Sequence, residues 1–100
     1  MIAQAQQYSS LIVLRDRHGD EVGTLSIGDG IFLGHSRDYV VIQYGDMIVT
    51  MDENQRNLGS VVLDQRYRIQ GITESGFYAK VDNAVIMYDK FCNKKDQYAV

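Results

Sequence analysis

One segment of the chain occurs twice in similar form, and this repeat constrains the fold more than any other feature. Residues 12–27 read IVLRDRHGDEVGTLSI, and residues 48–63 read IVTMDENQRNLGSVVL. Each copy contains an apolar run, an aspartate, a polar turn, a glycine and a second apolar run. The match continues into VIMYDKF at residues 85–91, with offsets of 36 and 37 residues. Because this period is typical of structural repeats, the chain is expected to form similar units that pack against one another.

The aspartate of the repeat recurs as Asp16, Asp52 and Asp89. An aspartate at a strand end commonly accepts hydrogen bonds from the backbone of the following turn, and we predict this role here. Two other roles stay open. The oxygen-rich turns 16–21 and 52–57 contain groups that suit Ca²⁺, although they lack the spacing of an EF-hand loop. Three equivalent carboxylates would also suit a symmetric catalytic site.

Short apolar segments with alternating polarity, separated by Gly, Asp and Asn, predict β-strands over almost the whole chain. Gly45-Asp46 and Asp82-Asn83 are hairpin signals at equivalent positions. A chain of this length is near the commonest size of one domain. We therefore expect a single domain, 1–100, in the following arrangement: repeat one at about 11–53, repeat two at about 54–90, a leftover strand at 11–16, and weakly ordered tails at 1–9 and 91–100.

The phrases IVTMDEN at residues 48–54 and VIMYDKF at residues 85–91 resemble the outer strand of a β-propeller blade. The resemblance implies an all-β fold with two repeats of about four short antiparallel strands. A small β-barrel or sandwich uses the same alternation and stays an alternative. The phrase YDKFCNKK at residues 88–95 is also similar to short two-repeat bacterial proteins of unknown function, of the kind carried on integron cassettes. That resemblance implies a fold and no activity.

Two blades cannot close a propeller ring, which usually has about four to eight blades. An open sheet edge also invites pairing with another chain. We therefore expect a homo-oligomer. A dimer is the commonest form, and three copies would give six blades.

Composition argues against several classes of protein. The formal net charge is −3 and the isoelectric point is about 5.1, which argues against a binder that depends on phosphate contacts with nucleic acid. The single cysteine, Cys92, excludes an intrachain disulfide. The first residues do not read as a signal peptide, and no apolar run is long enough to span a membrane. We expect a soluble cytoplasmic protein with no nucleic-acid or membrane partner.

No set of side chains has the spacing of a catalytic or metal site. Cys92, His18 and His35 are the candidates for a thiol–imidazole pair or a soft metal site. Nucleophilic catalysis needs the base within reach of the thiol, and zinc needs about four ligands at close spacings. The sequence shows no such spacing, so we expect no catalytic residues, no metal and no cofactor.

Two groups of residues are candidates for ligand binding. Tyr39 and Tyr78 lie near equivalent positions of the repeats and are expected in the core, at an interface or in a repeated pocket. Arg66 and Arg68 flank Tyr67 on one predicted strand, so both point to one face. That face is either solvated or a platform for a phosphate or an acidic partner.

The sequence thus favours a non-enzymatic binding or interaction module. A protein that binds a small molecule or glycan in repeated pockets is the first alternative. A small enzyme with an unrecognised site is the second.

Overall fold

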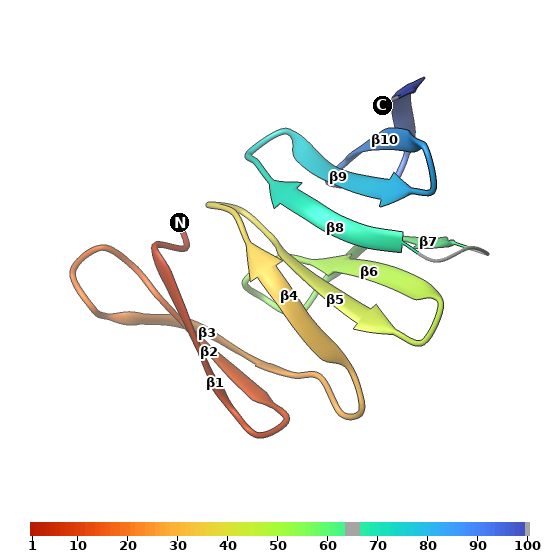
Figure 1. Ribbon diagram of the computed structural model, residues 1–100. Coiled ribbons are helices and arrows are strands. Elements are labelled where there is room, and N and C mark those ends of the chain that lie inside the picture. The colour runs from red at the N-terminus through yellow and green to blue at the C-terminus, as the bar shows by residue number, and fades with distance from the viewer. Residues whose placement is uncertain (64–66, 100) are drawn as a thin grey trace.

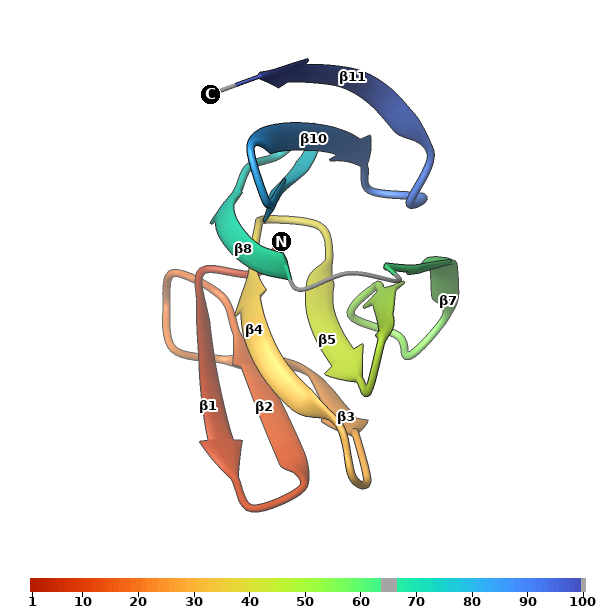
Figure 2. The same cartoon turned by 45° about the vertical axis from the view of Figure 1, so that its right-hand side comes forward.

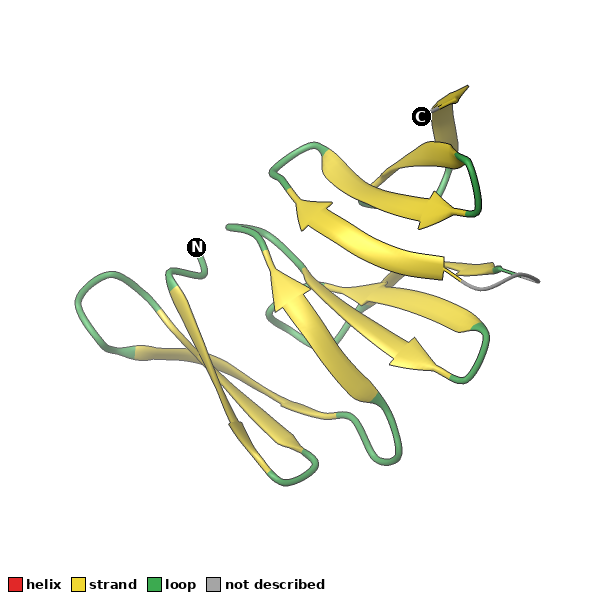
Figure 3. Ribbon diagram, in the orientation of Figure 1, coloured by secondary structure: helices red, strands yellow, loops and turns green. Residues whose placement is uncertain are grey.

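The computed structural model describes residues 1–63 and 67–99, and the regular elements there are all β-strands (Figure 1, Figure 3). Each of the three antiparallel sheets is a meander of consecutive strands. Sheet 1 contains β1 (Gln4–Tyr8), β2 (Leu11–Arg15) and β3 (Glu21–Ser26). Sheet 2 contains β4 (Ile31–His35), β5 (Val40–Tyr44), β6 (Met47–Met51) and β7 (Asn57–Val62). Sheet 3 contains β8 (Tyr67–Ile72), β9 (Gly76–Val81), β10 (Ala84–Asp89) and β11 (Lys94–Ala99).

The predicted all-β fold of blade-like antiparallel units is therefore confirmed, with three units of three or four strands where two repeats were expected. The sheets follow one another in chain order, as the red-to-blue colouring of Figures 1 and 2 shows. None of the described residues forms a helix long and apolar enough to cross a membrane.

Two hydrophobic cores hold the sheets together. The core between sheets 1 and 2 is formed by Ile2, Ile12, Leu14, Leu25, Ile27, Val40 and Ile42. The core between sheets 2 and 3 is formed by Tyr39, Val41, Ile48, Leu63, Phe77, Ala79, Tyr88 and Cys92. Because side chains alternate along a strand, β5 supplies both cores from a continuous apolar run. Sheet 2 is consequently covered on both faces, whereas sheets 1 and 3 each have one outer face.

The tight hairpin turns are equivalent in all three sheets. Ser9, Gly45 and Asp82 each begin a two-residue turn, with φ angles of 59°, 62° and 53°. A positive φ is what such a hairpin requires, and glycine and aspartate are among the residues that accept it most readily. The predicted hairpins at Gly45-Asp46 and Asp82-Asn83 are confirmed.

The ends of the chain differ from the expectation of weakly ordered tails. Residues 4–8 form β1 and residues 94–99 form β11. The leftover strand 11–16 is also not isolated, because it contributes β2, the central strand of sheet 1. Backbone pairing with β2 and β10 orders these segments, and backbone pairing leaves no hydrophobic pattern in the sequence. All six residues of β11 are exposed.

Close backbone contacts join successive sheets through glycine. A Cβ atom on Gly23 of β3 would lie 2.1 Å from the carbonyl oxygen of Glu53, and one on Gly59 of β7 would lie 2.0 Å from that of Phe91. Any larger residue would therefore push the turn of the next sheet away. The repeat places Asp96 of β11 at the position of Gly23 and Gly59. Sheet 3 therefore has no glycine there that would let the turn of a further sheet approach its backbone as closely.

Candidate functional site

The outer face of sheet 3 is the first candidate surface. Phe77, Ala79 and Tyr88 point into the core, so the residues that alternate with them point outward. Cross-strand pairing defines two outward rows. One row contains Arg68, Lys80, Val85 and Tyr98, and the other contains Tyr78, Met87 and Asp96. We call these seven residues the outer face of sheet 3.

This face combines apolar and charged groups. Tyr98 is 48% exposed, Tyr78 and Met87 are half-buried, and Val85 is covered. The 37-residue offset places these residues on four positions of sheet 2 that sheet 3 covers. Tyr78 corresponds to Val41, Met87 to Thr50, Val85 to Ile48 and Tyr98 to Val61. The outer face of sheet 3 thus keeps part of the apolar character of a packed face, although no further sheet of the described chain packs on it and only Val85 is buried by its neighbours.

A shallow cavity of about 190 Å³ lies at one end of this face. Its lining includes Thr73, Tyr78, Met87, Asp89 and Lys95. Few ligand pockets are this small, since typical volumes are about 300–1,000 Å³. The cavity suits a single inserted side chain better than a drug-sized molecule.

The outer face of sheet 1, at the opposite end of the molecule, is more polar. Gln4, Gln6 and Arg15 hold the positions at which sheet 2 has Val40, Ile42 and Met51. Arg15 Nε and the Tyr8 hydroxyl both donate to Gln6 Oε1, at 3.3 and 3.1 Å. Tyr8 and Leu11 stay partly exposed near the hairpin. A polar outer face is what terminal repeats need in order to end a stack in water.

The recurring aspartates serve the same structural role in each sheet. One carboxylate oxygen of Asp16 accepts from the amides of His18 and Asp20, at 2.8 and 3.0 Å. Asp52 and Asp89 accept in the same way from the amides two and four residues later. The predicted turn-capping role is confirmed.

These hydrogen bonds also change acidity. Burial raises the pKa of Asp16, but the amide hydrogen bonds from Asp20 and His18 outweigh it and hold the pKa below its usual value. The same balance, with amide bonds from Asn93 and Phe91, lowers the pKa of Asp89. Both groups are therefore stable carboxylates rather than proton donors. Among the described residues, no three His, Cys, Asp or Glu side chains are grouped to hold a metal ion.

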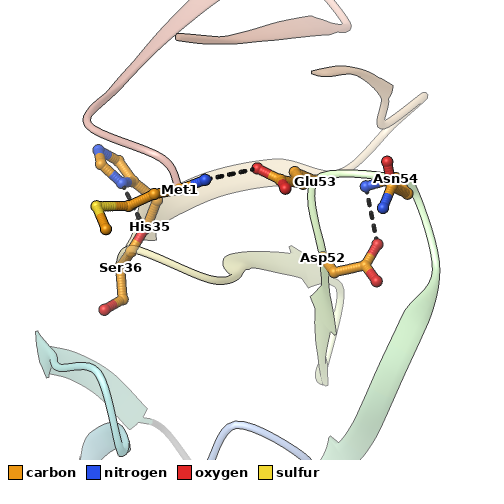
Figure 4. A network of polar contacts seen from close by, with 6 residues as sticks. All are labelled: Met1, His35, Ser36, Asp52, Glu53 and Asn54. Atoms are coloured by element: carbon orange, nitrogen blue, oxygen red, sulfur yellow. Dashed lines mark hydrogen bonds and ion pairs between the residues drawn. The ribbon is translucent and has the colours of Figure 1, made fainter. Parts of the chain in front are cut away.

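A second cavity, of about 320 Å³, lies beside the first of these turns and is lined by Met1, Asp16, Arg17, His18 and Val22. Figure 4 shows the Met1 amino group directed at the Glu53 carboxylate, 3.3 Å away, on the turn that follows Asp52. The ion pair joins the start of the chain to sheet 2. The cavity lining has no arrangement of nucleophile and base.

The predicted ligand-binding residues lie in different environments. Tyr39 is fully buried, and its hydroxyl donates to the carbonyl of Thr73 at 2.6 Å. Burial raises the pKa of Tyr39. Tyr78 instead lies on the outer face of sheet 3, so the two tyrosines do not form equivalent pockets. Arg68 is exposed on that same face, beside Lys80. Arg66 lies outside the described residues.

The candidate thiol–imidazole set is not brought together. Cys92 is buried between sheets 2 and 3, with Sγ 3.6 Å from Thr50 Oγ1. Burial raises the pKa of the Cys92 thiol. His18 lines the cavity beside sheet 1, and His35 Nδ1 lies 3.0 Å from the Ser36 carbonyl. Cys92 is consequently part of the core, not of a catalytic pair.

Comparison with known proteins supports the fold. No family model and no curated protein matches the sequence. The structure is similar to BamB from Moraxella catarrhalis, a β-propeller, with a TM-score of 0.53 and 13% identity. The match covers 97% of this chain and 34% of BamB. The chain thus spans about a third of the BamB propeller, and at this identity the likeness concerns the fold alone.

Proposed function

We propose that this chain is a non-enzymatic protein-interaction module that self-associates through the outer face of sheet 3. The observation that carries the proposal is the difference between the two ends of the stack. One end carries Gln4, Gln6 and Arg15 where sheet 2 is apolar, with Tyr8 and Leu11 exposed near its hairpin. The other end keeps Tyr78, Met87 and Tyr98 at positions that are packed between sheets elsewhere. A face of this composition, rich in Tyr and Met, is typical of protein interfaces.

A second copy is the partner that fits these residues. Arg68 and Lys80 lie on one side of the face and Asp96 on β11 at the other, so two copies of the face can place opposite charges across from each other. In a head-to-tail arrangement, the outer face of sheet 1 of one copy would pack on the outer face of sheet 3 of the next. This would bury Gln4, Gln6 and Arg15 against apolar groups at a desolvation cost. Association therefore stops at a two-fold dimer, the commonest symmetry of soluble oligomers.

The experiment is the solution mass of the wild-type chain and of matched charge variants. Met87→Lys places a cation in the middle of the outer face of sheet 3, and Gln6→Lys places one on the outer face of sheet 1. We expect a dimer for the wild type and for Gln6→Lys, and a monomer for Met87→Lys. Equal masses for the two variants would contradict it.

A small-ligand site is the second candidate function. The observation that favours it is the cavity beside Tyr78, which also has Asp89 and Lys95 in its lining. Saturation-transfer NMR with a panel of sugars and amino acids tests this candidate. Signals that disappear in Tyr78→Ala support it, and signals unchanged by that substitution contradict it.

A further inference from the structure

The free edge of β1 differs from the equivalent edges of the other sheets. The 36- and 37-residue offsets align β1 with β5 and β9, and the shared turns at Ser9, Gly45 and Asp82 confirm this alignment. This edge of β5 pairs with β4, and this edge of β9 pairs with β8. In the described residues no strand pairs with the corresponding edge of β1, so sheet 1 has three strands where its neighbours have four.

Ala5 and Gln7 carry the backbone groups at this edge. The Ile27 amide donates to the Ser10 carbonyl at 2.8 Å, so the even-numbered residues of β2 bond to β3 and the odd-numbered ones to β1. The β1 partners of those odd-numbered residues are Gln4, Gln6 and Tyr8. The amides and carbonyls of Ala5 and Gln7 therefore point away from β2. Their counterparts in sheet 2, Val41 and Gln43, pair with Gly34 and Ile31 of β4.

The edge of β1 lacks the features that usually protect an exposed strand. Charged residues, proline and β-bulges discourage pairing at an edge. The segment QAQQY contains no charge and no proline, and its register with β2 is regular from Gln4 to Tyr8. β11 at the other end has Lys94, Lys95 and Asp96, and its register with β10 is interrupted by a bulge. The two edges are thus built differently.

We propose that the edge of β1 binds an extended peptide segment of a partner protein, which pairs with Ala5 and Gln7 and completes sheet 1 as a fourth strand. Strand addition of this kind gains affinity from main-chain hydrogen bonds and specificity from alternate side chains. The binding site is distinct from the outer face of sheet 3.

The inner strands of sheets 2 and 3 define the sequence that fits. Both carry a register shift followed by glycine, at Phe32/Gly34 in β4 and Ile69/Gly71 in β8. A Cβ on Gly34 would lie 2.7 Å from Ile72 of the next inner strand. His35 holds the position in β4 that Ile72 holds in β8, so we expect glycine at the peptide position that corresponds to Gly34.

The neighbouring peptide positions follow from the same pairing. The residue opposite Gln6 shares the polar outer face of sheet 1 and should be polar. Of the positions on either side of it, that of Leu33 packs against the core with the next sheet and should be apolar. Ile31 is 57% exposed, so its position accepts either kind of residue. The partner segment therefore reads any residue, polar, apolar, glycine.

A synthetic probe can be taken from this chain itself. Residues 30–36, GIFLGHS, match the pattern once Phe32 is replaced by glutamine, which gives GIQLGHS with blocked ends. Binding is measured by fluorescence anisotropy of the labelled peptide, and the site by hydrogen exchange of the Ala5 and Gln7 amides. We expect saturable binding and slower exchange of both amides.

Two protein variants separate the backbone from the side chain. Gln7→Pro removes the outward amide, and proline is tolerated at an edge position whose N–H faces solvent. Gln7→Ala removes the side chain and keeps the amide. Gln7→Pro should weaken binding by about tenfold, the effect of one lost hydrogen bond of roughly 1.4 kcal/mol. Gln7→Ala should bind as the wild type does.

Two peptide variants remove any dependence on the folding of Gln7→Pro. A peptide N-methylated at the Ile31 position, or one carrying Gly34→Val, should lose binding to the wild-type protein. Absence of saturable binding, or equal binding by Gln7→Pro and Gln7→Ala, would overturn the proposal. Exchange is also measured without peptide at increasing protein concentration. If the Ala5 and Gln7 amides then exchange more slowly as concentration rises, a second copy occupies the edge, and the proposal is overturned. None of these outcomes changes the mass of the Met87→Lys variant. The peptide site and the proposed self-association are therefore tested by independent measurements, and either one can be contradicted without the other.

Discussion

The hydroxyl of Thr50 donates to the carbonyl oxygen of Lys90 at 2.6 Å, and this hydrogen bond joins sheet 2 to the turn before β11. Thr50 is fully buried on the face of β6 that meets sheet 3, and the Cys92 sulfur lies beside it. The bond satisfies a polar group inside an otherwise apolar contact. It also fixes the turn whose Phe91 carbonyl approaches Gly59.

Replacing Thr50 by valine tests this bond, because the two side chains have similar shape. We expect the free energy of unfolding to fall by about 1–2 kcal/mol, since the Lys90 carbonyl loses its hydroxyl donor in a partly buried site. Urea unfolding monitored by circular dichroism measures the change. Thr50→Ser keeps the hydroxyl and should lose less. A valine variant as stable as the wild type would show that the bond contributes nothing.

Gly59→Ala tests the close approach of sheets 2 and 3. The added Cβ would meet the Phe91 carbonyl oxygen at 2.0 Å, a backbone atom that cannot move without displacing the turn. We expect a loss of about 2 kcal/mol or more, as for other overpacked sites. Ser60→Ala, at the neighbouring exposed position, is the control and should be nearly neutral. Equal unfolding midpoints for both variants would contradict the contact.

Acid should destabilise the protein through Asp16 and Asp89. Their pKa values are lower in the folded chain than the usual value of 3.8, so folding favours the carboxylate. This stability is fully present above the unfolded-state pKa and is lost as pH falls through the folded-state pKa. Unfolding free energies should therefore be flat above about pH 5 and fall below it. Asp16→Asn should reduce the slope, and an unchanged slope would assign the acid sensitivity to other groups.

The buried thiol of Cys92 should react slowly. Burial raises its pKa above the usual value of 9.0, so little thiolate is present at neutral pH, and the core restricts access. Iodoacetamide should modify the native protein at least about tenfold more slowly than the urea-unfolded chain. Equal rates in the two states would place the thiol at the surface.

The sequence predicts most of the fold because turns and alternation are local properties. Asp16 and Asp52 show their turn role in the spacing of polar residues alone, and Gly45-Asp46 marks its hairpin. The strand at 4–8 is missed because Gln4, Gln6 and Gln7 give no apolar alternation, and its order comes from pairing with β2. β11 is missed for the same reason.

The candidate site is less accessible to prediction. Tyr78 aligns with Val41, so Tyr39, which precedes β5, lies two positions away from the matching place in its repeat. The Tyr39 ring lies between two sheets and the Tyr78 ring on an outer face. That difference depends on which sheets are neighbours, which alternation does not encode. The contrast between Gln6 in sheet 1 and Ile42 at the same position of sheet 2 is visible in the sequence once the third unit is recognised.

Solution mass, measured by light scattering behind a sizing column over a range of concentrations, tests the central claim most directly. One chain has a mass of 11.4 kDa. We expect a species of twice that mass, which dissociates on dilution and is absent in Met87→Lys. A wild-type chain that stays monomeric at all concentrations, or a stable trimer, would contradict self-association through the outer face of sheet 3.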